Sequence, residues 1–146
     1  MGHQVVARMQ WSDTVLDVAV PPELSAVTDA IEKSRAILQL KDNWDGEGSS
    51  GYTEDTWNQA AQFLFENALR LWNERGIAVS APAIYNGPEG SIDIYWGALD
   101  RKLLINIPAN SEEPATFYGQ DSSDHEIKGN LRLSDKNEWL MMWQME

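Results

Sequence analysis

After Gly76 the chain carries five short segments rich in β-branched and aromatic residues, with only short turns between them. The segments are IAVSAPAIYN (77–86), SIDIYWGA (91–98), RKLLINIP (101–108), PATFYGQ (114–120) and EIKGNLRL (126–133). Parallel neighbours need a crossover of a dozen or more residues, and these turns leave no room for one. We therefore expect four or five strands that pair with their neighbours in sequence, as an antiparallel meander over residues 77–133.

Two helical patterns come before these strands. Over residues 22–40, prolines open a segment in which apolar residues recur at helical spacing. Over residues 53–75 the apolar stripe is wider, Thr53 stands at the N-cap and Gly76 follows the last turn. A helical hairpin over residues 22–75 is therefore expected.

The remaining segments flank this pattern. Residues 1–21 are expected to form an N-terminal arm or an edge strand, because valines alternate with polar residues near their end. Residues 134–146 predict a short C-terminal helix, with Asp135 and Glu138 at capping-box spacing. Runs of helix followed by runs of strand are typical of an α+β domain. We predict a single α+β domain over residues 1–146, with helices packed on one face of a four- to five-stranded antiparallel sheet.

The C-terminal segment is apolar on nearly every side. Its bulky residues are Trp139, Leu140, Met141, Met142, Trp143 and Met145. A helix of this kind either fills the core or covers a partner. Two interpretations stay open: a core plug, or an interface that forms a homodimer or holds another protein, since methionine and tryptophan suit adaptable interfaces.

Charge and composition narrow the possible functions. The net charge is −12, so direct binding to nucleic acid or to anionic membranes is not expected. Cysteine is absent and there are two histidines, which argues against disulfides, thiolate metal sites and histidine-centred triads. No apolar run reaches the roughly 20 residues that cross a bilayer, and the first residues lack a signal-peptide pattern. A cytoplasmic protein is the expectation.

The stretch LKDNWDGEGSSGYTEDT connects the two predicted helices. Its glycines can adopt positive φ, its Asp and Asn side chains can accept hydrogen bonds from backbone N–H groups, and Trp44 can anchor it on the core. Aligning Asp45 and Gly46 with positions five and six of an EF-hand puts Lys41 and Tyr52 where carboxylates are needed. We therefore interpret the loop as a structural turn or a protein-binding epitope, and expect no metal.

Part of this loop resembles a widespread set of small uncharacterised bacterial proteins in which a WDGxGA turn precedes an amphipathic helix. Here the turn is NWDGEG (43–48), with Ser49 where alanine is usual. A P-x-I strand and a glycine-turn hairpin follow in those proteins, and PAI (82–84) and GPEG (87–90) keep that order. The resemblance covers about residues 40–107. It implies an α+β fold and no activity, because none is known for the group.

Three further groups of polar residues are candidates for a site. Asp93, Tyr95 and Asn106 alternate with apolar residues, so they are expected together on the sheet face away from the core, as a solvated face or a small-ligand site. Acidic residues also cluster at Glu112 and Glu113, and around His125. Carboxylates and a histidine can serve acid–base catalysis, but solvated acidic loops are the favoured interpretation.

The chain has no P-loop, dinucleotide fingerprint, HExxH or GxSxG motif. We therefore predict an acidic, non-enzymatic protein-binding module of bacterial or phage origin. It would regulate or neutralise a protein partner, of basic character, as immunity, antitoxin or anti-defence proteins do. The candidate surface comprises Asp42, Trp44, Asp45, Glu47, Glu112, Glu113, Asp121, Asp124, Trp139 and Trp143. The alternatives are a small-ligand or carbohydrate binder that uses tryptophans and the polar sheet face, and a small hydrolase that uses Asp45, Asp93 or His125. No cofactor is expected.

Overall fold

The computed structural model describes residues 11, 19–97 and 100–146. The helical elements are η1 (Pro22–Leu24), α2 (Ser25–Lys33), η2 (Ser34–Gln39), α3 (Glu54–Arg75), η3 (Pro88–Gly90) and α4 (Glu138–Met145). The strands are β1 (Ala83–Asn86), β2 (Ile92–Trp96), β3 (Lys102–Ile107), β4 (Ala115–Gln120) and β5 (Glu126–Leu131).

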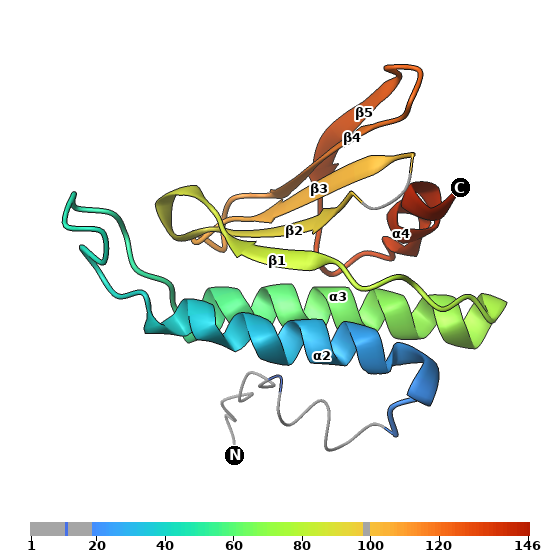
Figure 1. Ribbon diagram of the computed structural model, residues 1–146, viewed down its shortest axis with the longest axis horizontal. Coiled ribbons are helices and arrows are strands. Elements are labelled where there is room, and N and C mark those ends of the chain that lie inside the picture. Colours follow the sequence, from blue (N-terminus) through green and yellow to red (C-terminus); the bar gives the residue numbers. More distant parts are fainter. Residues whose placement is uncertain (1–10, 12–18, 98–99) are drawn as a thin grey trace, which may run out of the picture.

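The five strands form one antiparallel sheet in the order β1-β2-β3-β4-β5. This confirms the meander expected from the short turns. Figure 1 shows α2 and α3 side by side across one face of the sheet, with α4 near its far end and the 40–53 loop projecting at the left. The α+β fold with helices packed on strands is therefore confirmed.

The core lies between the helix pair and the sheet. Every second residue of β2 and β3 points into it, as the period-2 pattern predicts. The fully buried side chains include Ile92, Ile94, Leu103, Ile105 and Ile107 from these strands and Leu64, Phe65 and Leu71 from α3. Because the alternation is strict, the intervening residues of β2 and β3 must face away from the helices.

Helix α3 begins and ends where the sequence predicts. The Thr53 hydroxyl accepts a hydrogen bond from the Thr56 backbone N–H at 3.2 Å, and Gly76 adopts φ 65° as a left-handed C-cap.

The helix expected over residues 22–40 is instead three consecutive segments, since 3₁₀ turns flank α2. One local cause is Ser34, whose hydroxyl donates to the Ile31 carbonyl at 2.6 Å while accepting from the Trp57 indole at 2.9 Å.

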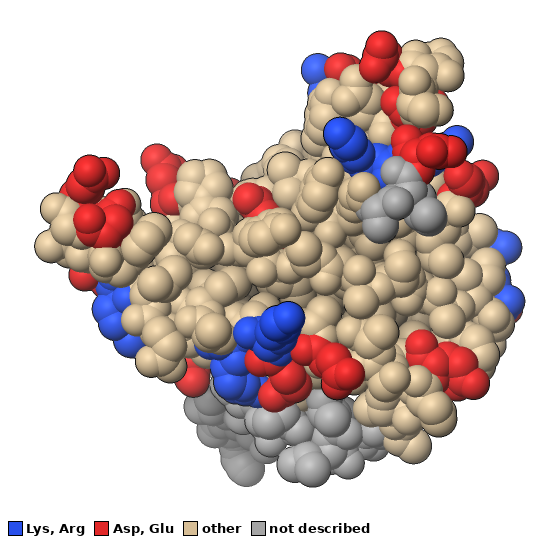
Figure 2. Space-filling view, in the orientation of Figure 1, with Lys and Arg blue, Asp and Glu red and all other residues tan. Residues whose placement is uncertain are grey.

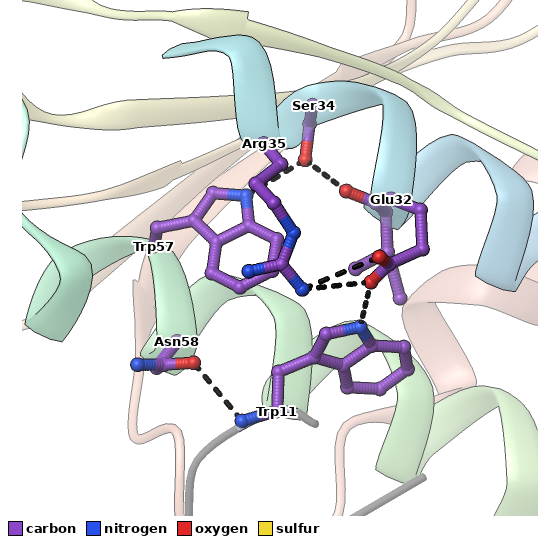
Figure 3. A network of polar contacts seen from close by, with 7 residues as sticks. Trp11, Glu32, Ser34, Arg35, Trp57 and Asn58 are labelled. Carbon is purple, nitrogen blue, oxygen red and sulfur yellow. Dashed lines mark hydrogen bonds and ion pairs between the residues drawn. The ribbon is translucent and has the colours of Figure 1, made fainter. Parts of the chain in front are cut away.

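Trp11 packs on the helix pair through its ring and its backbone (Figure 3). Its indole N–H donates to Glu32 at 2.5 Å, its backbone N–H donates to the Asn58 side chain at 3.0 Å, and its ring meets Phe65 edge-on at 5.2 Å. Arg35 pairs with the same Glu32 carboxylate. The expected N-terminal strand or arm over residues 1–21 lies outside the described residues, apart from Trp11 and residues 19–21.

Helix α4 differs from its expected cap. It begins at Glu138, and its N-cap is Asn137, which makes no side-chain capping bond, so the predicted Asp135–Glu138 capping box is wrong. Instead, the Asn137 backbone N–H donates to the buried Asn67 side chain of α3 at 2.9 Å. This long-range bond, which sequence spacing does not reveal, fixes the start of the helix.

Candidate functional site

The 40–53 loop is built from hydrogen bonds between its own side chains and backbone. Asp42 accepts from the Gly51 N–H at 2.8 Å, and the Asn43 side chain accepts from the Gly48 N–H at 2.7 Å. Asp45 accepts from the Glu47 N–H at 2.9 Å and from the Ser49 hydroxyl. Two of its acidic residues therefore stabilise the turn itself.

The charge on Asp45 is favoured by these same bonds. The Ser49 hydroxyl, followed by the Glu47 backbone N–H, holds the pKa of the Asp45 carboxyl below its ordinary value of 3.8. The carboxylate is fully solvated on its outer side, so the loop remains anionic at neutral pH although the group has a structural role.

Trp44 is fixed yet exposed. Its indole N–H donates to the Ser50 carbonyl at 3.1 Å, its ring lies 6.5 Å from the Tyr52 ring, and 41% of its surface is accessible. The Tyr52 hydroxyl in turn donates to the Gly87 carbonyl at 2.6 Å, from a buried position. A large aromatic surface is thus held by the loop and remains partly open to solvent.

Glycines let the loop approach the neighbouring turns. A Cβ on Gly90 would lie 3.1 Å from the Gly51 carbonyl oxygen and 3.3 Å from the Ala109 Cβ. The loop, the β1–β2 turn and the β3–β4 turn therefore meet at one end of the sheet. Glu112 and Glu113 follow Ala109 in the β3–β4 turn, so they share this end with Trp44.

A groove of about 490 Å³ separates the loop from the β1–β2 turn. Its lining consists of Trp44, Gly48, Ser49, Ser50, Tyr52, Asn86, Gly87, Pro88 and Glu89. The size falls within the range of small-molecule and side-chain pockets. The lining contains one charged side chain, Glu89, so the groove is anionic.

A polar cluster lies beside the groove on the open face of the sheet. The Asn106 amide donates to Asp93 at 2.7 Å and to the Ser91 hydroxyl at 2.9 Å, and Ser91 donates to the Pro88 carbonyl at 2.6 Å. A Cβ on Gly87 would lie 3.1 Å from both Cγ and Oδ2 of Asp93. The carboxylate therefore leans towards Gly87, which also lines the groove.

The open face carries aromatic residues as well. Tyr85 pairs with Asp93 across β1 and β2, and Asp93 pairs with Asn106 across β2 and β3, so the three form one row. Tyr95 and Tyr118 belong to the adjacent row. The expected grouping of Asp93, Tyr95 and Asn106 is confirmed by this register. Within residues 19–97 and 100–146, no helix covers this face (Figure 1).

Four glutamates surround the groove end of the molecule: Glu47, Glu89, Glu112 and Glu113 are exposed. Within the described part of the chain, no ion pair or hydrogen bond engages their carboxylates. Figure 2 shows red atoms on the projecting loop at the left and just to its right, and blue atoms directly below that loop and elsewhere in the view. This end of the sheet is therefore predominantly negative, with Lys41 as an exposed cation in the same loop.

The other predicted acidic residues lie at the opposite end, in the β4–β5 turn. Asp121 accepts from the backbone N–H groups of His125 and Ser123, both at 2.9 Å, which lowers the pKa of its carboxyl. Asp124 adopts φ 62° in the same turn and accepts from Gln120. Six-residue strands separate the two ends by roughly 20 Å, so the candidate surface is two surfaces rather than one.

The two C-terminal tryptophans have different environments. Trp139 is 48% exposed and meets Phe117 edge-on at 5.7 Å. Trp143 packs on Gly119 and carries Arg101 over its ring at 4.7 Å. Because Leu140 and Met141 are fully buried, α4 mainly fills the core. The homodimer through this helix stays a prediction.

The candidate acid–base residues come from three separate elements. Asp45 lies in the 40–53 loop and Asp93 on β2, while His125 pairs with Asp121 at 3.2 Å in the β4–β5 turn. In the described ranges, no group of three or more His, Asp or Glu is placed to hold a metal ion. Likewise, no helix described here is long and apolar enough to span a membrane.

Comparison with protein-family models, curated proteins and solved structures finds no match. The resemblance to small bacterial proteins with a WDGxGA turn therefore stays a prediction. Sequence reasoning missed Ser91, Gly87 and Tyr85 as neighbours of Asp93. The β1–β2 pairing brings Tyr85 opposite Asp93. The turn sequence NGPEGS indicates that a hairpin forms there, but it does not show which residues of the two strands pair.

Proposed function

We propose that the protein binds a basic protein partner through the acidic end of its sheet. This end comprises the 40–53 loop, the β1–β2 turn and the β3–β4 turn, and we call it the acidic end. One observation supports the proposal: four exposed glutamates without an ion pair in the described chain share this end of the sheet with an exposed, hydrogen-bonded Trp44.

The physical roles of the two parts differ. Uncompensated carboxylates attract a basic surface over a Debye length of about 8 Å at physiological salt, which raises the association rate. A fixed aromatic ring adds contact area at low entropic cost and slows dissociation, as anchoring residues do at interfaces. Regulation or neutralisation of the partner follows if the bound surface overlaps the one that the partner needs for its own activity.

The test is affinity capture from a lysate of the native host, followed by binding measurements with the purified captured protein. The key variant changes Glu47, Glu89, Glu112 and Glu113 to Gln, which moves the net charge from −12 to −8 because four negative charges are removed. A matched control changes Glu23, Glu66, Glu74 and Glu126 to Gln, with the same final charge on other surfaces.

We expect the first variant, and not the control, to lose at least tenfold in association rate at low salt, with the difference shrinking at high salt. If both variants lost association rate equally, binding would depend on net charge alone and not on the acidic end. Capture that does not respond to ionic strength would contradict the proposal.

A small-ligand function is the second candidate, and the groove of about 490 Å³ with Trp44 and Tyr52 in its lining is the observation that favours it. A thermal shift screen with sugars and nucleotides separates the two. A ligand-binding protein gains melting temperature with one compound class, whereas a protein-binding module responds to none.

A further inference from the structure

We propose that β5 is a surface through which two copies of this chain associate, by pairing their β5 strands antiparallel across a two-fold axis at Gly129. This inference goes beyond the proposed function and does not rest on it. In the described part of the chain, β5 is one edge of the sheet and pairs with β4 alone. Figure 1 shows β5 on the side of the sheet farthest from α2 and α3. The opposite edge, β1, is shorter and contacts α2 and η2, so β5 is the more open edge.

The turn before β5 determines which of its backbone groups face outward. The Asp121 N–H donates to the His125 carbonyl at 3.0 Å. Antiparallel pairs alternate between hydrogen-bonded and non-hydrogen-bonded, so the odd-numbered residues of β5 bond to β4. The N–H and C=O groups of Glu126, Lys128 and Asn130 therefore point away from the sheet. An edge with free groups of this kind is a template for another strand.

A two-fold axis at Gly129 suits the backbones of both copies. Lys128 then lies opposite Asn130 of the second copy, and their outward N–H and C=O groups can form hydrogen bonds in both directions. The two Gly129 residues face each other as a non-hydrogen-bonded pair, in which the Cα atoms approach to about 4.5 Å. A residue without a side chain fits this closest approach.

On the open face of the sheet, the same register brings opposite charges together. Glu126 lies opposite Arg132 of the second copy, and both residues are exposed. The Tyr118 hydroxyl donates to the Glu126 carboxylate at 2.8 Å and so orients it. Among the described residues, no carboxylate forms an ion pair with Arg132. Opposite charges that face each other across two strands stabilise their pairing, and the two-fold axis produces this pair twice.

On the face towards the helices, the register brings apolar residues together. Ile127 is half-buried and lies opposite Leu131 of the second copy. A hollow of about 460 Å³ adjoins this end of β5, and its lining includes Leu131, Phe117 and Trp139. Trp139 is 48% exposed in the single chain. The Ile127 side chain of a second copy can therefore cover apolar surface that one copy leaves open.

Two neighbouring registers fit less well. An axis at Lys128 would place the two Lys128 side chains opposite each other, and like charges in this position are destabilising. An axis at Ile127 would pair Glu126 with Lys128 but would run the ladder into Asp124, whose φ of 62° ends the extended backbone. The axis at Gly129 is the one that uses the whole length of β5.

The test measures the mass of the full chain by sedimentation equilibrium at rising protein concentration. Salt of about 0.15 M screens the net charge of −12 on each copy. We expect the mass to rise from 16.5 kDa towards twice that value. Arg132→Glu sets a carboxylate opposite Glu126 at both ends of the interface and should weaken association at least about tenfold. Adding Glu126→Arg to it restores opposite charges, and this double variant should associate within about threefold of the original chain.

Lys128→Glu is the matched control. It changes the net charge by the same amount as Arg132→Glu but faces Asn130, so association should stay within about threefold of the original. Asn130→Pro tests the backbone, because it removes an outward N–H that an edge strand does not need for its own sheet. This variant should not associate. Circular dichroism checks that each variant folds.

Three results would overturn the inference. The first is a mass of 16.5 kDa at every concentration. The second is association that Arg132→Glu and Asn130→Pro leave unchanged, since the copies would then meet through another surface. The third is a loss with Lys128→Glu but not with Arg132→Glu, which would place the two-fold axis elsewhere. These measurements involve no other protein, so this inference and the proposed function can fail separately.

Discussion

The docking of the 40–53 loop depends on a glycine at position 51 for steric reasons alone. A Cβ at Gly51 would lie 2.6 Å from the Asp42 backbone nitrogen and 2.7 Å from the Lys41 carbonyl carbon. Both atoms are backbone, so no side chain can rotate away. Gly51→Ala must therefore push residue 51 away from the Lys41–Asp42 backbone. This movement weakens the hydrogen bond from the residue 51 N–H to the Asp42 carboxylate, which is 2.8 Å long in the original chain.

The magnitude follows from these terms. Forcing extra volume into a packed contact costs about 1–3 kcal/mol, and a weakened hydrogen bond adds about 1 kcal/mol. The unfolded chain loses freedom on the same substitution, which offsets about 0.4–1 kcal/mol. We expect a net loss of about 1–3.5 kcal/mol in the free energy of unfolding.

Gly48→Ala in the same loop is the matched control. Gly48 has φ +81° and nothing lies within 4 Å of its Cβ position, so the substitution introduces backbone strain of about 1 kcal/mol without a clash. Urea unfolding followed by tryptophan fluorescence measures both variants, and the difference in midpoint multiplied by the slope gives the free energy. If Gly51→Ala is no more destabilising than Gly48→Ala, the loop is not packed as described.

Three other perturbations test separate parts of the structure. The pKa values of Asp45 and Asp121 are lowered in the folded protein, so each carboxylate contributes its full stabilisation above the unfolded pKa near 3.8. This contribution is lost as the pH falls through the lower folded pKa. Carbon-detected NMR titration of the carboxyl groups should show both midpoints below 3.8, and midpoints at or above 3.8 would contradict the turn geometry. Trp57→Phe removes the indole bond to the Ser34 hydroxyl and part of a buried ring, so chemical denaturation should report a loss of about 1–3 kcal/mol; an unchanged midpoint would refute that contact. Leu140→Ala should lower the free energy of unfolding by about 2–5 kcal/mol, because this side chain is fully buried. Trp139→Ala should lower it by about 1 kcal/mol. If the melting temperature falls more for Trp139→Ala than for Leu140→Ala, α4 is not a core element.

Local patterns were sufficient to predict most of the fold. The five strands and their antiparallel order follow from period-2 alternation and from turns too short for a crossover. Helix α3 follows from its stripe, its Thr53 cap and Gly76, all of which act within a few residues.

Long-range contacts explain what the sequence did not reveal. The start of α4 is set by a bond from Asn137 to Asn67, seventy residues away, so a local capping rule chose the wrong residue. Similarly, the Trp11 indole donates a hydrogen bond to Glu32 and its ring packs edge-on against Phe65. A periodic pattern in the sequence does not predict either contact.

The candidate site shows the same division. Composition identified the acidic loops, but not which carboxylates serve the turn itself, and Trp44, which was expected to anchor the loop on the core, is 41% exposed. Asp42 and Asp45 bind their own backbone, and Asp121 does so at the opposite end of the sheet. Only the three-dimensional structure shows the Asp93 carboxylate against Gly87, at the edge of the groove.

The most direct test of the acidic end as a binding surface is an NMR titration of the full chain with a twelve-residue peptide in which arginine alternates with glycine. Each tryptophan gives its own indole N–H signal, which makes the side chains separate reporters. We expect the Trp44 indole and the backbone amides of Glu47, Glu89 and Glu112 to shift in proportion to bound peptide, while the Trp139 indole does not. Shifts confined to the β4–β5 turn, or none at all, would contradict it.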